Sequence, residues 1–540
     1  MRVPALVPAL VVALVLVLAA CGPAGGAPAG AQTDATSATG AALGEVDFSI
    51  SAGPEAEAHF LRGVAALHSF WYDEAADAFR AAFEAEPGFA LAAWGETMTC
   101  NHPIWNEVDL ACGREALERL GPTPEARAAK AASESERGWL AAVETLFADG
   151  GDKADRDRAY ERAMAELAAA RPGDLEAAAF HALGIQGLVY GRAADEADRF
   201  PLLMRSAAKL EELFDRAPRH PGVLHYLIHA YDDPVHAPLG LRAARTYAEV
   251  APAAHHALHM PSHIFVQLGL WDRAAASNED AWAASVAWTE RRGLPVAKRD
   301  FHSLGWLAYA YLQQGRLAAA RETIEIAREA AAAESSPRVR HALGEMTARY
   351  RVETGEAPPG GLPEPGEHAG DAVLFALGLE ALDRDDPEAA GALAGRLEAM
   401  DDREGRVLAE ELHGLAAIAA GDVEGGLGRL ARAAELESEL PPPSGPPDPV
   451  KPALELHGEA LLRLGRPAEA AERFAASLAR TPRRTASLLG AARAAAAAGD
   501  AEAARRHRET LAEIWAGADE SFPPLAELAD AGGEAAAPGR

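Results

Sequence analysis

Small and apolar side chains recur along the chain at positions where two antiparallel helices have to cross closely. Counted from Ala56 as position 1, these are Gly63 at position 8, Ala75 at 20, Phe79 at 24, Ala82 at 27 and Pro87 at 32. The small residues let the two helices approach, the aromatic ring fills the gap between them, and the proline ends the second helix. This pattern predicts one helix hairpin in about every 34 residues.

The pattern returns along most of the chain, with interruptions. Further frames begin at Ala90, Leu175, Pro221, His255 and Phe301, and a late frame from Lys451 places Gly458, Gly465, Ala470, Phe474 and Pro482 at positions 8, 15, 20, 24 and 32. Insertions fall near residues 105–135, 191–200 and 285–300, and the Pro- and Gly-rich stretch 353–370 is typical of a linker. We therefore predict an all-α solenoid in two halves, 45–352 and 371–522.

Composition agrees with helices and limits the class of partner. The chain of 540 residues is too long for one compact core, and its 49% hydrophobic but only 6% aromatic residues favour helix over sheet. The formal net charge of −30 makes the surface acidic, which repels phosphate backbones. Nucleic acid is therefore not expected as a partner.

The N-terminus resembles a bacterial lipoprotein signal, residues 1–21. An apolar run ends in the lipobox-like sequence Leu18-Ala19-Ala20-Cys21-Gly22. The resemblance implies that Cys21 is acylated and that the protein is exported and anchored, with Gly22 pointing to the outer membrane, facing the periplasm. The alternatives are an ordinary secretory signal or a short membrane anchor.

The segments outside the repeats and the remaining cysteines complete the expected organisation. Residues 22–44 are rich in Gly, Ala, Pro, Ser and Thr and predict a flexible tether, while 523–540 predict a disordered tail. In an oxidising compartment Cys100 and Cys112 are either a disulfide or two small buried residues. The sequence leaves both alternatives open.

Over about residues 50–515 the chain resembles the tetratricopeptide-repeat family. The segments 70–75, 101–107, 225–234 and 259–265 are similar to a group of exported bacterial repeat proteins without an assigned activity. The resemblance implies a solenoid fold but does not imply a catalytic mechanism. The chain also has no phosphate-binding loop, nucleophile elbow, Rossmann fingerprint or C-x-x-C pair, so the sequence favours a protein that is not an enzyme and leaves an enzyme as the alternative.

In tetratricopeptide arrays, positions 2, 5, 9, 12 and 13 of each repeat line a concave groove. The corresponding residues here are Trp94, Asn101, His102, His225, His229, Asp232, Asp233, His256, His259, His263, Gln267 and His302. The leading hypothesis is therefore a lipid-anchored scaffold that binds a peptide or protein partner through these side chains.

A second hypothesis is a metal-binding protein or metal-dependent enzyme whose metal site is made by His225, His229, His259 and His263. The members of each pair are four residues apart, so they share a helix face, and the two pairs are 34 residues apart. Imidazoles suit a transition metal such as zinc, with Asp232 or Asp233 as a ligand or an orienting group. The motif is not H-E-x-x-H, so hydrolysis is not implied.

The same residues allow other interpretations. Histidines on a concave face can instead bind a peptide or pin neighbouring helices. Pro261 could delay the start of its helix and so separate His259 from His263. His220 is interpreted as a surface residue, and Glu455 and Glu459 as a solvated acidic face.

Overall fold

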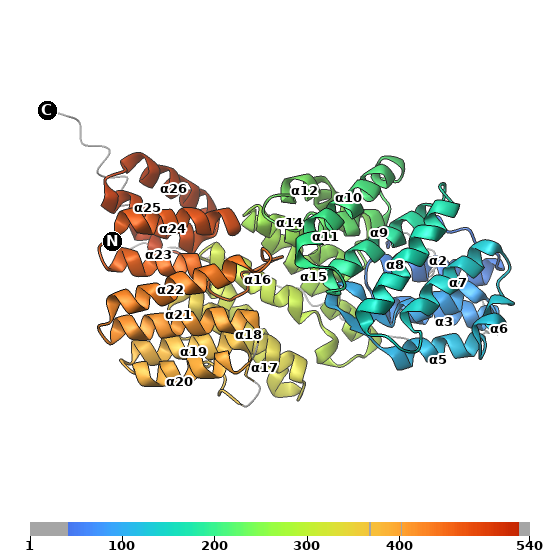
Figure 1. The fold of residues 1–540 in the computed structure, drawn as a ribbon, viewed down its shortest axis with the longest axis horizontal. Helices are drawn as coiled ribbons and strands as arrows, with labels where there is room; N and C mark the ends of the chain where they lie inside the picture. The colour runs from blue at the N-terminus through green and yellow to red at the C-terminus, as the bar shows by residue number, and fades with distance from the viewer. Residues whose placement is uncertain (1–41, 367–368, 401, 529–540) are drawn as a thin grey trace, which may run out of the picture.

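The protein is an all-α solenoid of tetratricopeptide-type helix hairpins (Figure 1). The computed structural model describes residues 42–366, 369–400 and 402–528. The predicted signal with Cys21 lies outside these ranges. One antiparallel strand pair, β1 (Asn101–His102) and β2 (Glu107–Val108), interrupts the helices. Within the described ranges, no helix has the length and apolarity needed to cross a bilayer.

The N-terminal half contains the helices that carry most of the histidines. They are α2 (Pro54–His68), α3 (Tyr72–Ala85), α4 (Ala90–Met98), α5 (Leu110–Leu120), α6 (Pro124–Ala128), α7 (Glu134–Leu146), α8 (Lys153–Ala170), α9 (Leu175–Tyr190), α10 (Arg199–Arg216), α11 (Pro221–Ala230), α12 (Ala237–Val250), α13 (His255–His259), α14 (Pro261–Gln267), α15 (Trp271–Arg292), α16 (Phe301–Gln313), α17 (Leu317–Ala333) and α18 (Pro337–Thr354). Most helices contact the next helix along the chain.

The C-terminal half is a more regular stack, at the left of Figure 1. Its helices are α19 (Asp371–Asp383), α20 (Pro387–Glu398), α21 (Arg403–Ala419), α22 (Val423–Ser438), α23 (Ala453–Arg463), α24 (Pro467–Arg480), α25 (Thr485–Ala498) and α26 (Ala501–Ile514). Between α18 and α19, the described residues 355–366, 369 and 370 form no helix, and this segment coincides with the predicted linker.

The small residues act as the spacing predicts. A methyl group added at Gly63 would lie 2.7 Å from the ring of Phe79, so only glycine lets α2 and α3 approach across that ring. In the late repeat, Phe474 fits against Gly458 in the same way, at 3.0 Å. Both phenylalanines are completely buried. The predicted hairpin geometry is thus confirmed at both ends of the array.

The folded region is longer at both ends than predicted from the sequence. Leu43, which we assigned to the tether, is buried, and the carbonyl of Ala42 accepts a hydrogen bond from the Ala253 amide at 3.1 Å. Leu525 and Leu528, which we assigned to the tail, pack against the core. Apolar side chains at these positions find long-range partners that the local composition does not reveal.

The two halves are packed together and not merely linked. The indole of Trp515, just after α26, donates to the carbonyl of Gln313 in α16 at 3.0 Å. The guanidinium of Arg484, also in the C-terminal half, bonds to Tyr309 and Glu353 of the N-terminal half. Residues of the C-terminal half therefore close back on α16 and α18.

Glu411 on α21 is a buried carboxyl group whose replacement is expected to stabilise the protein. Its two oxygens have no hydrogen-bond partner within the described residues, and burial together with Glu437 raises its pKa well above the ordinary value. The unfolded chain ionises this group above about pH 4.5 and the folded chain does not, so stability falls as pH rises. Glu411→Gln should raise the free energy of unfolding by roughly 1–3 kcal/mol at pH 8 and by little at pH 4.5.

Guanidinium unfolding of parent and variant at both pH values checks this expectation. The control is Glu435→Gln, because the side chain of Glu435 is 68% exposed and pairs only with Arg432 across the surface. A gain for Glu411→Gln that is the same at both pH values would show that the carboxyl group does not resist ionisation.

Candidate metal centre

Six histidines from three consecutive repeats meet inside the N-terminal half. α11 supplies His225 and His229, α13 and α14 supply His256, His259 and His263, and α16 supplies His302. The interruption at Pro261 does not separate His259 from His263, because Met260 between them keeps helical dihedral angles (φ −53°, ψ −36°). Both i, i+4 pairs therefore remain on one helix face.

The structure divides the four predicted metal ligands between two groups and adds a third histidine to each. One group, called here the inner trio, is His225, His229 and His256, and the other, the outer trio, is His259, His263 and His302. In each trio the three ligand nitrogens lie within 4.8 Å of one another. The four predicted ligands thus lie in two neighbouring three-histidine groups and not in one group of four.

In the outer trio, two ring nitrogens face each other at close range. The Nε2 atoms of His259 and His263 are 3.1 Å apart. His263 Nδ1 donates to Asp232 Oδ2 at 2.6 Å, and His259 Nδ1 donates to Asn278 Oδ1 at 2.6 Å. The amide orientation of Asn278 is set because its Nδ2 donates to Ala274 O at 2.7 Å.

In a neutral imidazole only one nitrogen carries a proton. If both rings are neutral, their protons are used at Nδ1, and two lone pairs point at each other across 3.1 Å. Lone pairs in this arrangement repel unless a cation or a proton lies between them. Zinc–nitrogen bonds of about 2.0–2.1 Å in tetrahedral geometry place ligand nitrogens ~3.3 Å apart, close to the separation of this pair.

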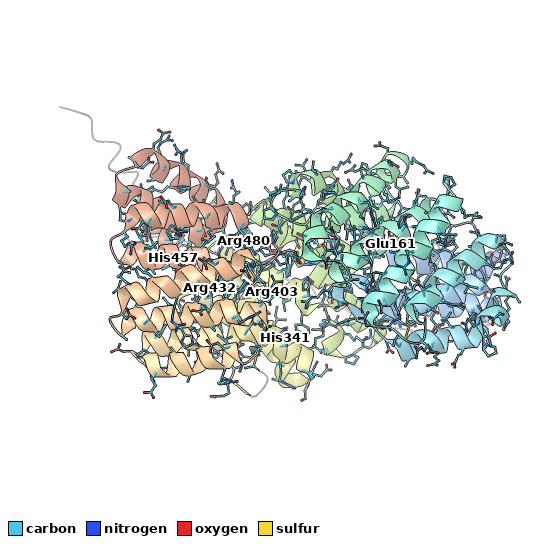
Figure 2. The ribbon with its side chains drawn as sticks, in the orientation of Figure 1. Glu161, His341, Arg403, Arg432, His457 and Arg480 are labelled. Carbon is cyan, nitrogen blue, oxygen red and sulfur yellow. A yellow bond between two sulfur atoms is a disulfide. The ribbon has the colours of Figure 1, made fainter. Side chains whose placement is uncertain are left out.

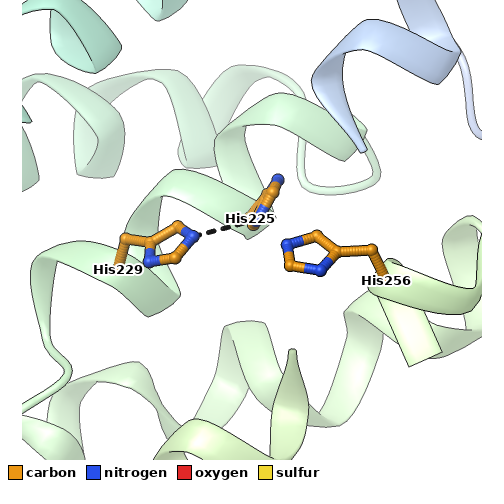
Figure 3. Close-up of side chains that lie close together, drawn as sticks. All are labelled: His225, His229 and His256. Atoms are coloured by element: carbon orange, nitrogen blue, oxygen red, sulfur yellow. Dashed lines mark hydrogen bonds between the residues drawn. The ribbon is translucent and has the colours of Figure 1, made fainter. Parts of the chain in front are cut away.

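The inner trio lies deeper and is shown in Figure 3. His225 Nδ1 donates to the carbonyl of His68 at 2.6 Å, which leaves its Nε2 as an acceptor 3.1 Å from His229 Nε2. His256 Nε2 is buried and has no hydrogen-bond partner within the described residues. Burial lowers the pKa of His225 to about 3 and the pKa values of His229 and His256 well below 6.5, so all three rings are neutral at pH 7.

Aromatic side chains close the inner trio from the outside. Phe70 adopts a left-handed conformation (φ 51°), which is strained for a bulky residue, and its ring centroid lies 4.3 Å from that of His225. Trp105, between β1 and β2, lies against His256 at 5.6 Å. The disulfide between Cys100 and Cys112, with Cα atoms 5.9 Å apart, closes the loop that carries Trp105.

A third cluster, which the sequence analysis did not identify, is fully satisfied by hydrogen bonds. Glu176 accepts from His68 Nε2 at 2.7 Å and from His220 Nε2 at 3.0 Å. Burial acts to raise the pKa of Glu176, but His220 and His68 hold it below the ordinary value. His220 is therefore a buried structural residue and not the surface residue that we predicted.

A cavity of about 940 Å³ between the two halves reaches the outer trio. His302 and Trp306 lie in its wall, and His302 is exposed to it. Its other lining residues include His341, labelled near the junction of the halves in Figure 2, together with the loop Pro441–Pro446. Of the outer trio, His302 therefore borders this cavity.

The predicted groove residues do not line an open groove. Ten of the twelve side chains are buried: Trp94, Asn101, His225, His229, Asp232, Asp233, His256, His259, His263 and Gln267. His102 is half-buried and stacks on Tyr72 at 4.0 Å, and only His302 is exposed. These side chains are buried because the Phe70 turn, the Trp105 loop and Pro443 cover the face that an open array would expose. Gln267, for example, donates to the carbonyl of Pro443 at 2.6 Å.

Comparisons with known proteins give no family assignment. No family model matches the chain, and no curated protein matches it. Among solved structures it is similar to a chain of the Cut9–Hcn1 hetero-tetramer of the APC/C, with 14% identity, 83% of this chain and 78% of that chain covered, and a TM-score of 0.32. It is also similar to a monomeric IFIT1 mutant with Gppp-AAAA, with 12% identity, coverage of 87% and 92%, and a TM-score of 0.32. Values this low transfer neither a partner nor an activity.

Proposed function

We propose that the protein binds a transition metal ion at the outer trio and presents an open coordination position of that ion to the cavity. The observation that carries this proposal is the 3.1 Å approach of His259 Nε2 and His263 Nε2, whose Nδ1 protons are both committed elsewhere. Three imidazole ligands with a fourth, open position are typical of zinc sites that bind a further ligand. Imidazole also suits copper and nickel.

The hydrogen bonds around the outer trio have the form that a metal site requires. A ligating histidine generally donates its other nitrogen to a carboxylate or carbonyl oxygen, which fixes its orientation. Asp232 does this for His263 and Asn278 for His259. Gln267 in turn holds Asp232, because its Nε2 lies 3.2 Å from Asp232 Oδ1.

The partner in this proposal is a small ligand or a short peptide segment that enters the cavity. A volume of about 940 Å³ is near the upper end of ordinary ligand pockets, which are roughly 300–1,000 Å³, and too small for a folded domain. Both basic and acidic side chains lie in the wall, among them Arg338, Arg349, Glu345 and Asp371. A ligand with a metal-binding group and charges of both signs matches this lining.

Export and anchoring through Cys21 are part of the proposal. The lipobox-like sequence at residues 18–22 supports them, and so does the Cys100–Cys112 disulfide, since disulfides persist mainly in oxidising compartments. Globomycin sensitivity and palmitate labelling of the parent, against Cys21→Ala, would test the anchor. An unlabelled parent would contradict it.

Elemental analysis tests the metal proposal. Protein without residues 1–21 and without a histidine tag is loaded separately with zinc, copper and nickel, then dialysed. We expect at least one tightly held equivalent of metal, and the loss of one equivalent in His263→Ala. His413→Ala is the matched control, because His413 lies on α21 in the other half and pairs only with Glu398. A parent that retains no metal, or equal loss in both variants, would overturn the proposal.

A further inference from the structure

The two trios form one continuous cluster. Ring centroids are 4.9 Å apart for His225 and His229, 5.8 Å for His229 and His263, and 5.0 Å for His263 and His259. The circuit closes through His256, which lies 5.9 Å from His259 and 5.1 Å from His225. Five imidazoles thus enclose one region of the protein interior, with the two trios on either side of it.

The inner trio has the features of a second metal centre. His225 Nε2 is an acceptor, because its Nδ1 proton goes to the carbonyl of His68, which can only accept. His229 Nε2 can donate to it across 3.1 Å, so this pair alone does not require an ion. The decisive residue is His256, whose side chain is buried and whose Nε2 has no partner within the described residues. Figure 3 shows the far nitrogen of its ring directed toward His225 and His229.

A buried nitrogen that points at two others without a hydrogen bond is rare in folded proteins, because buried polar atoms are nearly always paired. Phe70 and Trp105 lie against this trio, with ring centroids 5.7 Å and 5.6 Å from His256. The three rings have only imidazole nitrogens to offer. Their chemistry selects a first-row ion that accepts nitrogen ligands, zinc or copper, and not calcium or magnesium.

We propose that His225, His229 and His256 hold a second metal ion beside the first, so that the histidine core is a two-ion centre. The outer ion is open to the cavity through His302, and the inner ion is closed by Phe70 and Trp105. His229 and His263 are the point of contact between the two centres. This inference rests on the proposed function, since it places the second ion next to the first.

Metal stoichiometry distinguishes the two proposals. Zinc-loaded, dialysed protein is expected to hold two equivalents, and His256→Ala and His302→Ala are each expected to hold one. The double variant should hold none, and His413→Ala should still hold two. One equivalent in the parent that His256→Ala leaves unchanged would overturn the second centre and keep the first. No retained zinc or copper in the parent would overturn both.

A second variant and a second measurement distinguish the loss of a metal site from misfolding. His256→Gln keeps a polar side chain of similar size and should also lose one equivalent, with an unchanged far-ultraviolet circular dichroism spectrum. Copper(II) loading provides the signal, because adjacent copper ions couple magnetically. The integrated paramagnetic resonance per copper should be lower in the parent than in His256→Gln. Equal intensity per copper in the two proteins would contradict adjacent ions.

Discussion

Replacing Arg484 with methionine is expected to lower the free energy of unfolding by about 3–5 kcal/mol. The Arg484 side chain is 1% exposed and binds Glu455 through two parallel hydrogen bonds of 2.8 and 2.9 Å. Its third nitrogen reaches Glu353 at 2.7 Å and Tyr309 at 3.2 Å. Although burial acts to raise it, Arg484 and Lys451 hold the pKa of Glu455 at about 2. Methionine would therefore leave two buried carboxylates without their main counter-charge.

Guanidinium unfolding measures this loss, and Arg493→Met is the matched control. Arg493 lies on α25, the helix that Arg484 directly precedes, but its pair with Glu527 is about half exposed, so its removal should change stability by less than about 1 kcal/mol. Arg484→Lys should recover part of the loss, because it keeps the charge and loses the paired geometry. Equal effects of Arg484→Met and Arg493→Met would show that the ion pair does not hold the halves together.

Cleavage within residues 355–370 by a limiting amount of protease should also become faster in Arg484→Met. The described residues of that segment form no helix, and the contacts of Arg484 are among those that join the halves on either side of it. Faster cleavage there would locate the loss at the junction. Faster cleavage elsewhere would indicate general unfolding.

The repeat fold could be predicted because its signals are local. The spacing of Gly63 to Phe79, and of Gly458 to Phe474, lies within one hairpin, and the physical requirement is a glycine where a ring crosses a helix. The same local rule predicted the two histidine pairs, since residues four apart share a helix face in any helix. Even the prolyl interruption at Pro261 did not disturb the second pair.

The closure of the array could not be predicted, because it depends on contacts between residues far apart in the chain. Position counting places Glu455 on a solvated face in an open array, but Arg484 and the Lys451 amine bury it. Likewise, Phe70 reaches His225 from 155 positions earlier in the chain. The repeat period of the sequence gives no sign of such long-range contacts. This is why the groove prediction failed while the helix hairpins were correct.

The third histidine of each trio could also not be predicted as a metal ligand from the i, i+4 spacing. His256 and His302 stand at position 2 of their repeats, outside the i, i+4 spacing that marks the pairs. Asn278 carries no signal at all, because an asparagine in a long polar helix is unremarkable without its 2.6 Å contact to His259. A histidine at position 2 in two consecutive repeats is the one clue that a search for ligand sets could have used.

Asp232→Asn is expected to weaken metal binding at the outer trio by about 10–100-fold. The carboxylate accepts the Nδ1 proton of His263 at 2.6 Å, so it fixes the ring and makes Nε2 a stronger ligand. The side-chain oxygen of asparagine still accepts the hydrogen bond but carries no charge. The loss of metal affinity therefore measures the effect of the charge and not of the ring orientation alone. Competition titration with a chelator of known affinity reports the change in dissociation constant.

Asp233→Asn provides the comparison, because Asp233 is the neighbouring residue and is just as deeply buried. Its carboxylate bonds to His236 Nδ1 at 2.7 Å and to the amides of Val235 and His236, all outside both trios. It should change thermal stability and leave the metal dissociation constant within about twofold, well short of the 10–100-fold loss expected when a metal-orienting carboxylate is removed. If the two variants weakened binding equally, Asp232 would be acting through the turn and not through His263. If neither did, the histidine pair would not need a carboxylate to hold its ion.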